Sequence, residues 1–538
     1  MDAAKPGKLG NRALSVFQWL IPLLLCLVPA RAGLDFGWHP DEWFHTQRVI
    51  NALNGESFGG TDLHTDIPYG SYIYPGVPHI LSLIPVLPHM VNEWAKASTG
   101  IGVGMENSKS FVEAKVDYLV ARRFIFIFVA ALSVPWVYFQ VRAMGRSGWE
   151  AMLAGLVLAL SWEYGYHCRW VAPDCIMAQF VALALVGCLR FYSERARTLP
   201  LYLAAAAAGL ATGSKYPGGL ALLPVLIVVF QTRAGLSWAE ILTRYLKVGA
   251  VFVVTYLLTT PGTVMTPGAF IRDVRCVTGV YSAGWFGYTV KTCGEHLEKM
   301  LAYFTTASFS HYFPLAIILF AVAVYGAVIL CRESPRVAVL FLCVPVIYVA
   351  YFSLQRAMIV RNLMVILPFV AVLIARGVAS LHERVYRLPF RIAVVLTVAA
   401  MLTVNLSWIL YAANCVRHRR DIERFGTEMQ KYVENHPKRH FLVSNRVFQV
   451  FESRGHCPLN ISRTDTSTFD EMIFFASELQ YPNLLAWPVN RPGRIKEVFG
   501  PWEKNYNYYQ WPSDDAIMVV TKERASRFPF DIVGECRR

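Results

Sequence analysis

The chain has 538 residues, of which 55% are hydrophobic and only 16% are charged. Because a soluble domain usually carries about 25% charged residues, this composition excludes an ordinary soluble protein and indicates an integral membrane protein. The formal net charge of +14 fits the basic clusters that flank membrane spans on their cytoplasmic side. It therefore requires no nucleic-acid partner, and we predict none.

Apolar runs recur along the chain, and their lengths of about 17–22 residues suit a hydrocarbon core roughly 30 Å thick. The first run follows Lys5, Lys8 and Arg12 in the manner of a signal peptide, but its length and the later spans favour a membrane anchor. We predict about eleven spans, near residues 13–31, 119–141, 149–162, 174–191, 200–213, 217–231, 246–260, 309–331, 336–353, 360–377 and 391–412.

Short basic clusters fall at alternate ends of these spans, and the positive-inside rule makes that side cytoplasmic. The opposite, extracytoplasmic end then carries acids and bases together. Any one of them could be a snorkelling anchor at the membrane interface, but both signs on one face favour a functional site. The basic clusters are Arg142/Arg146, Arg190/Arg195/Arg197, Arg233/Arg244/Lys247, Arg332/Arg336 and Arg376/Arg384/Arg387/Arg391; the residues at the opposite end are Asp41, Glu42, Arg122, Arg123, Arg169, Asp174, Lys215, Arg356 and Arg361.

Two predicted extracytoplasmic loops are long, residues 32–118 and 261–308. The first contains Tyr72-Ile73-Tyr74-Pro75 and an apolar stretch at residues 77–94 that prolines interrupt. Since proline breaks a helix interior, we predict interfacial helices there instead of a span. A span at this place would invert the topology of everything after it.

The cysteines are scattered and show no CxxC or paired Cys/His spacing, so we predict no zinc site. Cys276 and Cys293 share the second long loop, and the sequence leaves open whether they form a disulfide or remain two thiols.

We predict two domains. Residues 1–413 form the transmembrane domain, and residues 414–538, which are polar and rich in Tyr and Trp, form a small extracytoplasmic α/β domain. Asn460-Ile461-Ser462 in the second domain is a glycosylation sequon, a triplet that is frequent by chance.

His39-Pro40-Asp41-Glu42 follows the first apolar run and is the most informative motif. A carboxylate here can act as a general base, and repulsion between Asp41 and Glu42 would raise one of their pKa values toward neutrality. Alternatively, either acid could cap the helix suggested at residues 43–53. His39 could be a metal ligand, and His45 could orient the Asp41 carboxylate or simply pack.

Further candidates follow in chain order. Asp174 comes after Pro173 at the start of a span, where it could cap a helix or take part in chemistry. Lys215 lies in Gly213-Ser214-Lys215-Tyr216-Pro217-Gly218, which breaks the helix beside a cation and could bind an anion or be a plain turn. Arg361 begins a span and could bind a lipid phosphate or anchor in headgroups.

Carboxylates beside several cations describe a site that binds an anion and moves a proton. Transfer of a sugar from a phosphate-linked donor needs both parts, because cations hold the leaving phosphate while a carboxylate accepts the proton of the attacking hydroxyl. Arginine suits fork-like phosphate binding and lysine a point contact. Arg122 and Arg169 are further candidates for binding the donor phosphate. Carboxylates at a phosphate site can also recruit a divalent metal ion, so the sequence leaves the metal dependence of the reaction open.

The order of apolar span, acidic pair, Tyr-Pro segment, Arg169-Trp170-Val171-Ala172-Pro173-Asp174 and Gly209-Leu210-Ala211-Thr212-Gly213-Ser214-Lys215-Tyr216 resembles the membrane-embedded GT-C glycosyltransferases. In particular it resembles the protein-mannosyltransferase-like branch, family 39, and its bacterial relatives. The His-Pro-Asp-Glu motif is also similar to the signature of the dolichyl-phosphate-mannose transferases of N-glycan and GPI-anchor assembly. The resemblance covers roughly residues 13–380.

The resemblance implies a polytopic GT-C fold and an inverting glycosyltransferase. Such an enzyme moves a hexose such as mannose from a polyprenyl-phosphate donor to a lipid, glycan or protein acceptor. By matching position, Asp41 would be the catalytic base, Glu42 and Asp174 would support substrate hydroxyls, and Lys215 and Arg361 would hold the donor phosphate.

The resemblance also implies an extracytoplasmic active site, in a bacterial inner (plasma) membrane or the endoplasmic reticulum. No triplet typical of the added lumenal domain of eukaryotic protein O-mannosyltransferases is present, so the sequence does not support a protein acceptor. A transporter or lipid flippase is the alternative, but it would place charges at mid-membrane. A non-catalytic subunit would tolerate loss of the acidic pair.

Overall fold

The structure is a computed structural model. It describes residues 8–31, 34, 40–53, 72–97, 106–113, 116–194, 197–284, 289–310, 312–384, 388–418, 422–443, 447–448, 451, 458–462, 469–475, 497–499 and 517–521. The chain divides into two compact units. We call Met1–Arg31, Asp41–Trp285 and Thr289–Ile409 the membrane unit, and Ala32–Pro40, Phe286–Tyr288 and Leu410–Arg538 the C-terminal unit.

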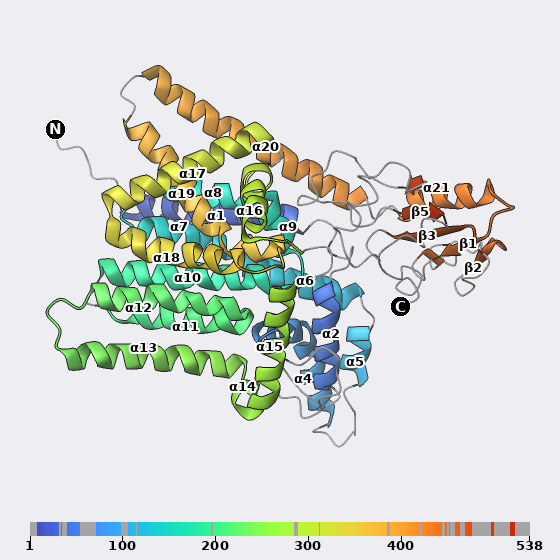
Figure 1. Ribbon diagram of the computed structural model, residues 1–538, viewed down its shortest axis with the longest axis horizontal. Coiled ribbons are helices and arrows are strands. Elements are labelled where there is room, and N and C mark those ends of the chain that lie inside the picture. The colour runs from blue at the N-terminus through green and yellow to red at the C-terminus, as the bar shows by residue number, and fades with distance from the viewer. Residues whose placement is uncertain are drawn as a thin grey trace. The chain divides into compact units, whose positions relative to one another are not determined.

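The membrane unit is built of helices, and its long helices α10, α11, α13, α17 and α18 lie side by side (Figure 1). Its helical elements are α1 (Lys8–Ala30), α2 (Pro40–Leu53), α3 (Val77–Leu83), η1 (Ile84–Val86), α4 (Leu87–Ala97), α5 (Glu106–Glu113), α6 (Val116–Ala131), α7 (Ser133–Ala143), α8 (Gly148–Ala159), α9 (Trp162–Cys168), α10 (Pro173–Ser193), α11 (Leu199–Ser214), η2 (Tyr216–Ala221), α12 (Leu222–Gln231), α13 (Trp238–Thr259), α14 (Gly262–Met265), α15 (Pro267–Ala283), α16 (Cys293–Thr306), α17 (Phe313–Glu333), α18 (Pro335–Ser353), η3 (Val360–Val365), α19 (Leu367–Arg384) and α20 (Leu388–His418).

Helices cover each of the predicted spans. Within the described residues, six helices are long and apolar enough to cross a membrane, and four further apolar helices are shorter. The protein is therefore a polytopic helical membrane protein, while the number of crossings stays a prediction. The six are Asp117–Ala143, Pro173–Ser193, Trp238–Thr259, Phe313–Glu333, Pro335–Ser353 and Arg391–Leu410; the four are Leu14–Leu27, Gly148–Ala159, Leu199–Ser214 and Tyr216–Gln231.

Helix α10 is the centre of the membrane unit, since most of its span is buried against neighbouring helices. Alanines of α11, among them Ala204 and Ala205, pack against Cys188 and Phe191 of α10 in one buried cluster. Small side chains let helix backbones approach closely, and close packing is the main source of helix association inside a membrane. Helices α10 and α11 are thereby held together, and each carries one residue of the site described below.

A second close approach joins α17 to α19. A Cβ atom added at Gly326 or at Gly377 would overlap a backbone carbonyl of the facing helix, at Leu373 and Val322 respectively. Glycine at these two positions therefore sets how near the two helices come. Since α19 follows directly on η3, this contact also fixes the segment that carries Arg361.

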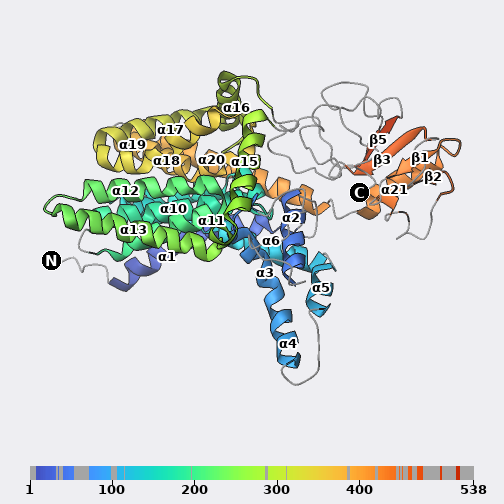
Figure 2. The same cartoon turned by 60° about the horizontal axis from the view of Figure 1, so that its bottom comes forward.

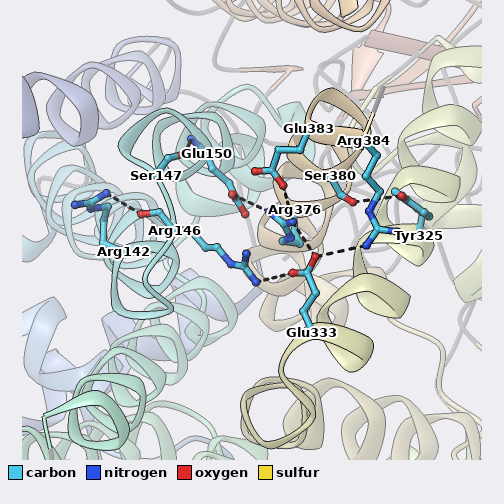
Figure 3. A network of polar contacts seen from close by, with 10 residues as sticks. All are labelled: Arg142, Arg146, Ser147, Glu150, Tyr325, Glu333, Arg376, Ser380, Glu383 and Arg384. Atoms are coloured by element: carbon cyan, nitrogen blue, oxygen red, sulfur yellow. Dashed lines mark hydrogen bonds and ion pairs between the residues drawn. The ribbon is translucent and has the colours of Figure 1, made fainter. Parts of the chain in front are cut away.

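A network of charged side chains ties α8, α17 and α19 together (Figure 3). The Arg376 guanidinium donates to Glu150 at 3.1 Å, to Glu333 at 3.2 Å and to Glu383 at 3.1 Å. Arg146 also donates to Glu333, at 2.7 Å. Three of the cations that the sequence assigned to the cytoplasmic end, Arg146, Arg376 and Arg384, thus share the carboxylate of Glu333.

Replacing Arg376 with leucine is expected to lower the free energy of unfolding by about 3–5 kcal/mol. The reason is that Glu150, only 4% exposed, would keep a buried negative charge without its partner. Arg384→Leu is the matched control, because Arg384 is 55% exposed and 3.7 Å from Glu333, where an ion pair contributes about 0–1 kcal/mol. Thermal unfolding of the two purified variants in one detergent checks this, and equal losses would contradict it.

The first long loop folds into short helices. Residues 77–97 form α3, η1 and α4 in succession, and this helical rod runs away from the bundle (Figure 2). Ile84, Leu87, Val91 and Trp94 are exposed on it, while Val86 packs in a cluster with residues of α2, α5 and α6. Among the described helices, this rod is not one that meets both the length and the hydropathy of a membrane span, and an apolar exposed face is typical of a helix at the membrane interface.

The C-terminal unit contains α21 (Ile422–Glu434) and a five-stranded sheet in the order β2-β1-β3-β5-β4. Strand β1 pairs in parallel with β2 and β3, while β5 pairs antiparallel with β3 and β4. Met429 and Val433 of α21 form a buried core with sheet residues such as Phe441 and Ile473. Its extracytoplasmic location stays a prediction. The strands are β1 (Phe441–Val443), β2 (Ile461–Ser462), β3 (Glu471–Phe475), β4 (Glu497–Phe499) and β5 (Ile517–Thr521).

Candidate functional site

Asp174 and Lys215 are positioned by the ends of two packed helices. The chain is extended at Ala172, α10 begins at Pro173, and Asp174 lies in its first turn. Lys215 ends α11 in an extended conformation, after which η2 begins. The Gly218 amide donates to the Lys215 carbonyl at 2.8 Å, and a Cβ atom at Gly218 would overlap the Ala211 carbonyl. Glycine therefore allows the chain to fold back tightly beside Lys215.

The two residues form a buried ion pair that a third segment completes. The Lys215 ammonium donates to Asp174 Oδ1 at 2.6 Å and to Asn362 Oδ1 at 2.6 Å. Arg361 Nε lies 3.7 Å from Asp174 Oδ2. We call Asp174, Lys215, Arg361 and Asn362 the lysine cluster. The structure thus brings together three of the residues that the sequence singled out, from α10, α11 and η3.

Electrostatics keep Lys215 charged. Burial disfavours the ammonium form most strongly, but the charge of Asp174, the nearby Tyr281 and the hydrogen bond to Asp174 together outweigh it and raise the pKa of Lys215 above its ordinary value. Because two cations face one carboxylate, the cluster retains a net positive charge. Such a site favours an anion.

Asp174 Oδ2 and Asn362 Nδ2 of the lysine cluster have no hydrogen-bond partner in the described part of the chain, and both side chains are almost fully buried. The orientation of the Asn362 amide is fixed, because a lysine can only donate and Oδ1 must therefore face Lys215. An unsatisfied acceptor and an unsatisfied donor beside a net positive charge are features that a phosphorylated or hydroxylated ligand would satisfy.

Glu42 lies in a second buried ion pair. Arg123 donates to its two oxygens, through Nε at 2.7 Å and Nη2 at 2.5 Å. The Val171 amide also donates to Glu42 Oε1 at 3.3 Å, and Arg123 lies over the Trp170 ring at 4.8 Å. Glu42 therefore fastens the first turns of α2 to the segment that leads into Asp174.

The other two predicted phosphate ligands contact aromatic rings. Arg122 donates to Thr46 Oγ1 at 2.7 Å and lies 4.8 Å from the Tyr118 ring centre. Arg169 lies 4.9 Å from the Trp170 ring centre. Both are buried. Their binding of a donor phosphate stays a prediction.

The predicted base is only partly described. Asp41 lies in the first turn of α2, but its side chain, like the whole of His39, lies outside the described residues. His45 Nδ1 is 3.1 Å from His79 Nδ1, and burial, aided by the charge of Arg48, lowers the pKa of His79 to about 3. His79 is therefore neutral at physiological pH and can share one hydrogen bond with His45.

The histidine pair connects to the lysine cluster through Tyr74. The Tyr74 ring stacks near His45, with 5.5 Å between ring centres, and its hydroxyl accepts from Arg361 Nη2 at 3.5 Å. Tyr74 stays in place because its neighbours are tied to other helices: the Tyr72 amide donates to Asp273 Oδ2 at 3.1 Å, and the Gly76 amide to Thr260 Oγ1 at 3.1 Å.

Among the described side chains, no group of three or more His, Cys, Asp or Glu is arranged to hold a metal ion. The side chain of Asp41 is not among them, so a metal site that includes it is untested. Cys276 and Cys293 are free, exposed thiols, which settles the alternative that the sequence left open.

Sequence reasoning missed three features of this region. Asn362 carries no charge and stood out only as the neighbour of Arg361. Arg123, and not Arg122, pairs with Glu42. Which of these adjacent arginines faces Glu42 depends on how α6 is rotated about its axis, and the sequence does not show that rotation. Glu163 and His167 of α9, beside the start of α10, lie between the predicted spans 149–162 and 174–191, and the sequence did not single them out.

The family model described as dolichyl-phosphate-mannose-protein mannosyltransferase (PMT) matches residues 98–265. No curated protein matches the chain. One similar solved structure is ArnT from Cupriavidus metallidurans bound to undecaprenyl phosphate, with 12% identity, a TM-score of 0.48, and coverage of 96% of this chain and 98% of that one. Another is the oligosaccharyltransferase AglB from Archaeoglobus fulgidus in complex with an inhibitory peptide and a dolichol-phosphate, with 12% identity, a TM-score of 0.45, and coverage of 90% and 73%. The arabinofuranosyltransferase AftD from Mycobacteria gives 11% identity, a TM-score of 0.45, and coverage of 95% and 40%.

The segment that matches the family includes α10, α11 and the turn after α11, and therefore both Asp174 and Lys215. It lies within a polytopic helical membrane protein whose buried acids and bases meet at the ends of these helices. Residues 98–265 of this polytopic membrane protein are therefore similar to the PMT family.

Proposed function

We propose that the protein moves a hexose, mannose in the first place, from a polyprenyl-phosphate donor to an acceptor hydroxyl with inversion at the sugar carbon. The observation that carries this proposal is the lysine cluster, a buried group of two cations and one carboxylate with an unsatisfied amide donor. A phosphodiester between a sugar and a lipid presents the negative charge and the oxygen acceptors that this cluster fits.

In the proposed reaction, the Asp41 carboxylate accepts the proton of the acceptor hydroxyl while the oxygen of that hydroxyl attacks the anomeric carbon of the donor sugar. The bond between that carbon and the phosphate oxygen breaks, and its electrons leave on the polyprenyl phosphate. Lys215 and Arg361 hold this phosphate and stabilise the charge that it gains. The Asn362 amide donates a further hydrogen bond to it.

The two remaining carboxylates take different roles in this proposal. Asp174 Oδ1 is engaged by Lys215, but Oδ2 can accept a hydrogen bond from a substrate hydroxyl. Glu42 accepts from Arg123 and the Val171 amide with its two oxygens, so we assign it to positioning. In this proposal its contacts hold the turn that carries Asp41, and the support of a substrate hydroxyl by Glu42 stays a prediction.

We further propose that the site opens on the extracytoplasmic face, of an endoplasmic reticulum membrane or a bacterial inner membrane, toward a lipid or glycan acceptor. The two sets of charges support one orientation. Arg146, Arg376 and Arg384 meet around Glu333, while Glu42, Asp174 and Lys215 belong to other helix ends. An excess of Arg and Lys marks the cytoplasmic side.

The purified protein in phosphatidylcholine nanodiscs is expected to bind dolichyl-phosphate mannose or undecaprenyl-phosphate sugars. The matching polyprenyl phosphate without a sugar should compete with these donors for the site. The free sugar phosphate should compete far less, because it lacks the apolar chain that partitions into the bilayer. Equilibrium binding of radiolabelled donor checks this. Failure to bind any polyprenyl phosphate, with or without a sugar, would reject the proposed function.

A further inference from the structure

Helix α9 presents polar and aromatic side chains beside the lysine cluster. It packs against the start of α10 and against η3, which carry Asp174 and Arg361. The Ser161 hydroxyl begins the helix by accepting the Tyr164 amide at 3.2 Å, and it also donates to the Ser308 carbonyl. These bonds hold α9 rigidly in place.

Glu163 and His167 lie one turn apart on this helix. Glu163 is completely buried; its Oε2 accepts from the Tyr303 hydroxyl at 3.1 Å and lies 3.8 Å from His167 Nε2. Glu163 Oε1 has no hydrogen-bond partner among the described residues. His167 is 18% exposed, and the charges of Asp174 and Arg361 both influence its pKa. His167 therefore adjoins Glu163 on a helix that packs against the two elements carrying Asp174 and Arg361.

Burial favours the neutral form of both groups. Burial raises the pKa of Glu163 well above its ordinary value, although the Tyr303 hydrogen bond opposes this. Burial lowers the pKa of His167 to about 4; Asp174 opposes the shift and Arg361 adds to it. A carboxylic acid and a neutral imidazole can each donate and accept one hydrogen bond. The lysine cluster, in contrast, is ionised.

Aromatic rings lie beside these two groups, on the neighbouring stripe of α9 and just after its end. The ring centres of Trp162 and Tyr166 are 5.7 Å apart, and those of Tyr166 and Trp170 are also 5.7 Å apart. Neutral donors and acceptors beside aromatic rings suit an uncharged hexose, since hydroxyls take the hydrogen bonds and the CH face of the sugar packs on a ring. The ionised lysine cluster suits the phosphate next to it.

We propose that Glu163 and His167 form the subsite for the transferred sugar, in which His167 contacts sugar hydroxyls and Glu163 keeps the imidazole in place. This inference rests on the proposed function and adds to it a division of the donor between two groups of residues: the lysine cluster binds the phosphate, and α9 binds the sugar.

The test compares two lipids in nanodiscs, dolichyl phosphate and dolichyl phosphate carrying mannose or glucose. His167→Ala is expected to weaken binding of a sugar-bearing lipid about tenfold, as for loss of one to two hydrogen bonds, and to leave binding of dolichyl phosphate within twofold. His167→Gln should recover most of the loss, because an amide also donates and accepts. His382→Ala is the matched control, since His382 of α19 contacts Trp149 far along the helix from η3.

Glu163→Gln adds a second arm, because glutamine imitates a protonated glutamate in shape and should bind the sugar-bearing lipids nearly as the unmodified protein does. Glu163→Leu should lose the preference for them. The inference is overturned if His167→Ala weakens both lipids equally or neither, or if the unmodified protein shows no preference for a sugar-bearing lipid over dolichyl phosphate. If the unmodified protein binds none of these lipids, the proposed function fails instead.

Discussion

Lys215→Ala is expected to weaken binding of a polyprenyl phosphate by roughly 10- to 150-fold and to reduce transfer at least as much. A hydrogen bond to a charged group contributes about 1.5–3 kcal/mol, which corresponds to that range of affinity. Lys215 is the cation of the lysine cluster with the shortest contacts, at 2.6 Å to Asp174 and 2.6 Å to Asn362. Equilibrium binding of radiolabelled donor in nanodiscs measures the change.

The same substitution also affects folding, and the design must separate the two effects. Without Lys215, the carboxylate of Asp174, only 2% exposed, loses its nearest cation, and breaking one side of a buried pair costs about 3–5 kcal/mol of stability. The double variant Lys215→Met with Asp174→Asn removes both charges, so stability should largely return while phosphate binding stays weak. A double variant that is stable and binds donor normally would show that Lys215 serves the fold alone.

The sequence was sufficient to predict Asp174, Lys215 and Arg361 as one group. Glycine and proline around Lys215 end a helix, and Pro173 begins one, so both residues had to lie at helix ends. Alternating basic clusters then assigned these ends to the same side. What could not be predicted was which atoms meet, because that depends on how α10, α11 and η3 pack against one another.

Helix α9 shows why other residues escaped notice. Residues 149–162 read as one apolar span, yet α8 ends at Ala159 and a separate helix starts at Trp162. The break is made by Ser161, whose hydroxyl caps α9, and hydropathy averaged over a span cannot register a single cap. Glu163 and His167 were therefore hidden between an apolar run and the Pro-Asp motif.

The acidic pair Asp41 and Glu42 is a second case in which the sequence alone could not assign roles. Asp41 and Glu42 are adjacent and chemically alike, so the sequence could not divide their roles. The structure shows the partners of one of them: Glu42 meets Arg123 and Val171 inside the membrane unit, which supports our assignment of Glu42 to positioning.

Asp41→Asn is accordingly expected to reduce transfer by about 10²–10⁴-fold, the usual contribution of a general base, with normal donor binding and normal unfolding temperature. Glu42→Gln should behave differently. Because Arg123 is completely buried and would lose its counter-ion, this variant should lose about 3–5 kcal/mol of stability together with activity. Both isosteric changes remove one charge, so each serves as the control for the other in assays of transfer, donor binding and thermal unfolding.

The double variant Glu42→Leu with Arg123→Leu completes the comparison. Removing both members of a buried pair in favour of apolar side chains is often neutral for stability, so the unfolding temperature should recover. Transfer should stay below normal, because the first turn of α2 would no longer be tied to Val171 by the Glu42 carboxylate. If Asp41→Asn transfers sugar at the normal rate while Glu42→Gln remains folded and inactive, the base is Glu42, and the positions of the two carboxylates in the reaction must be exchanged.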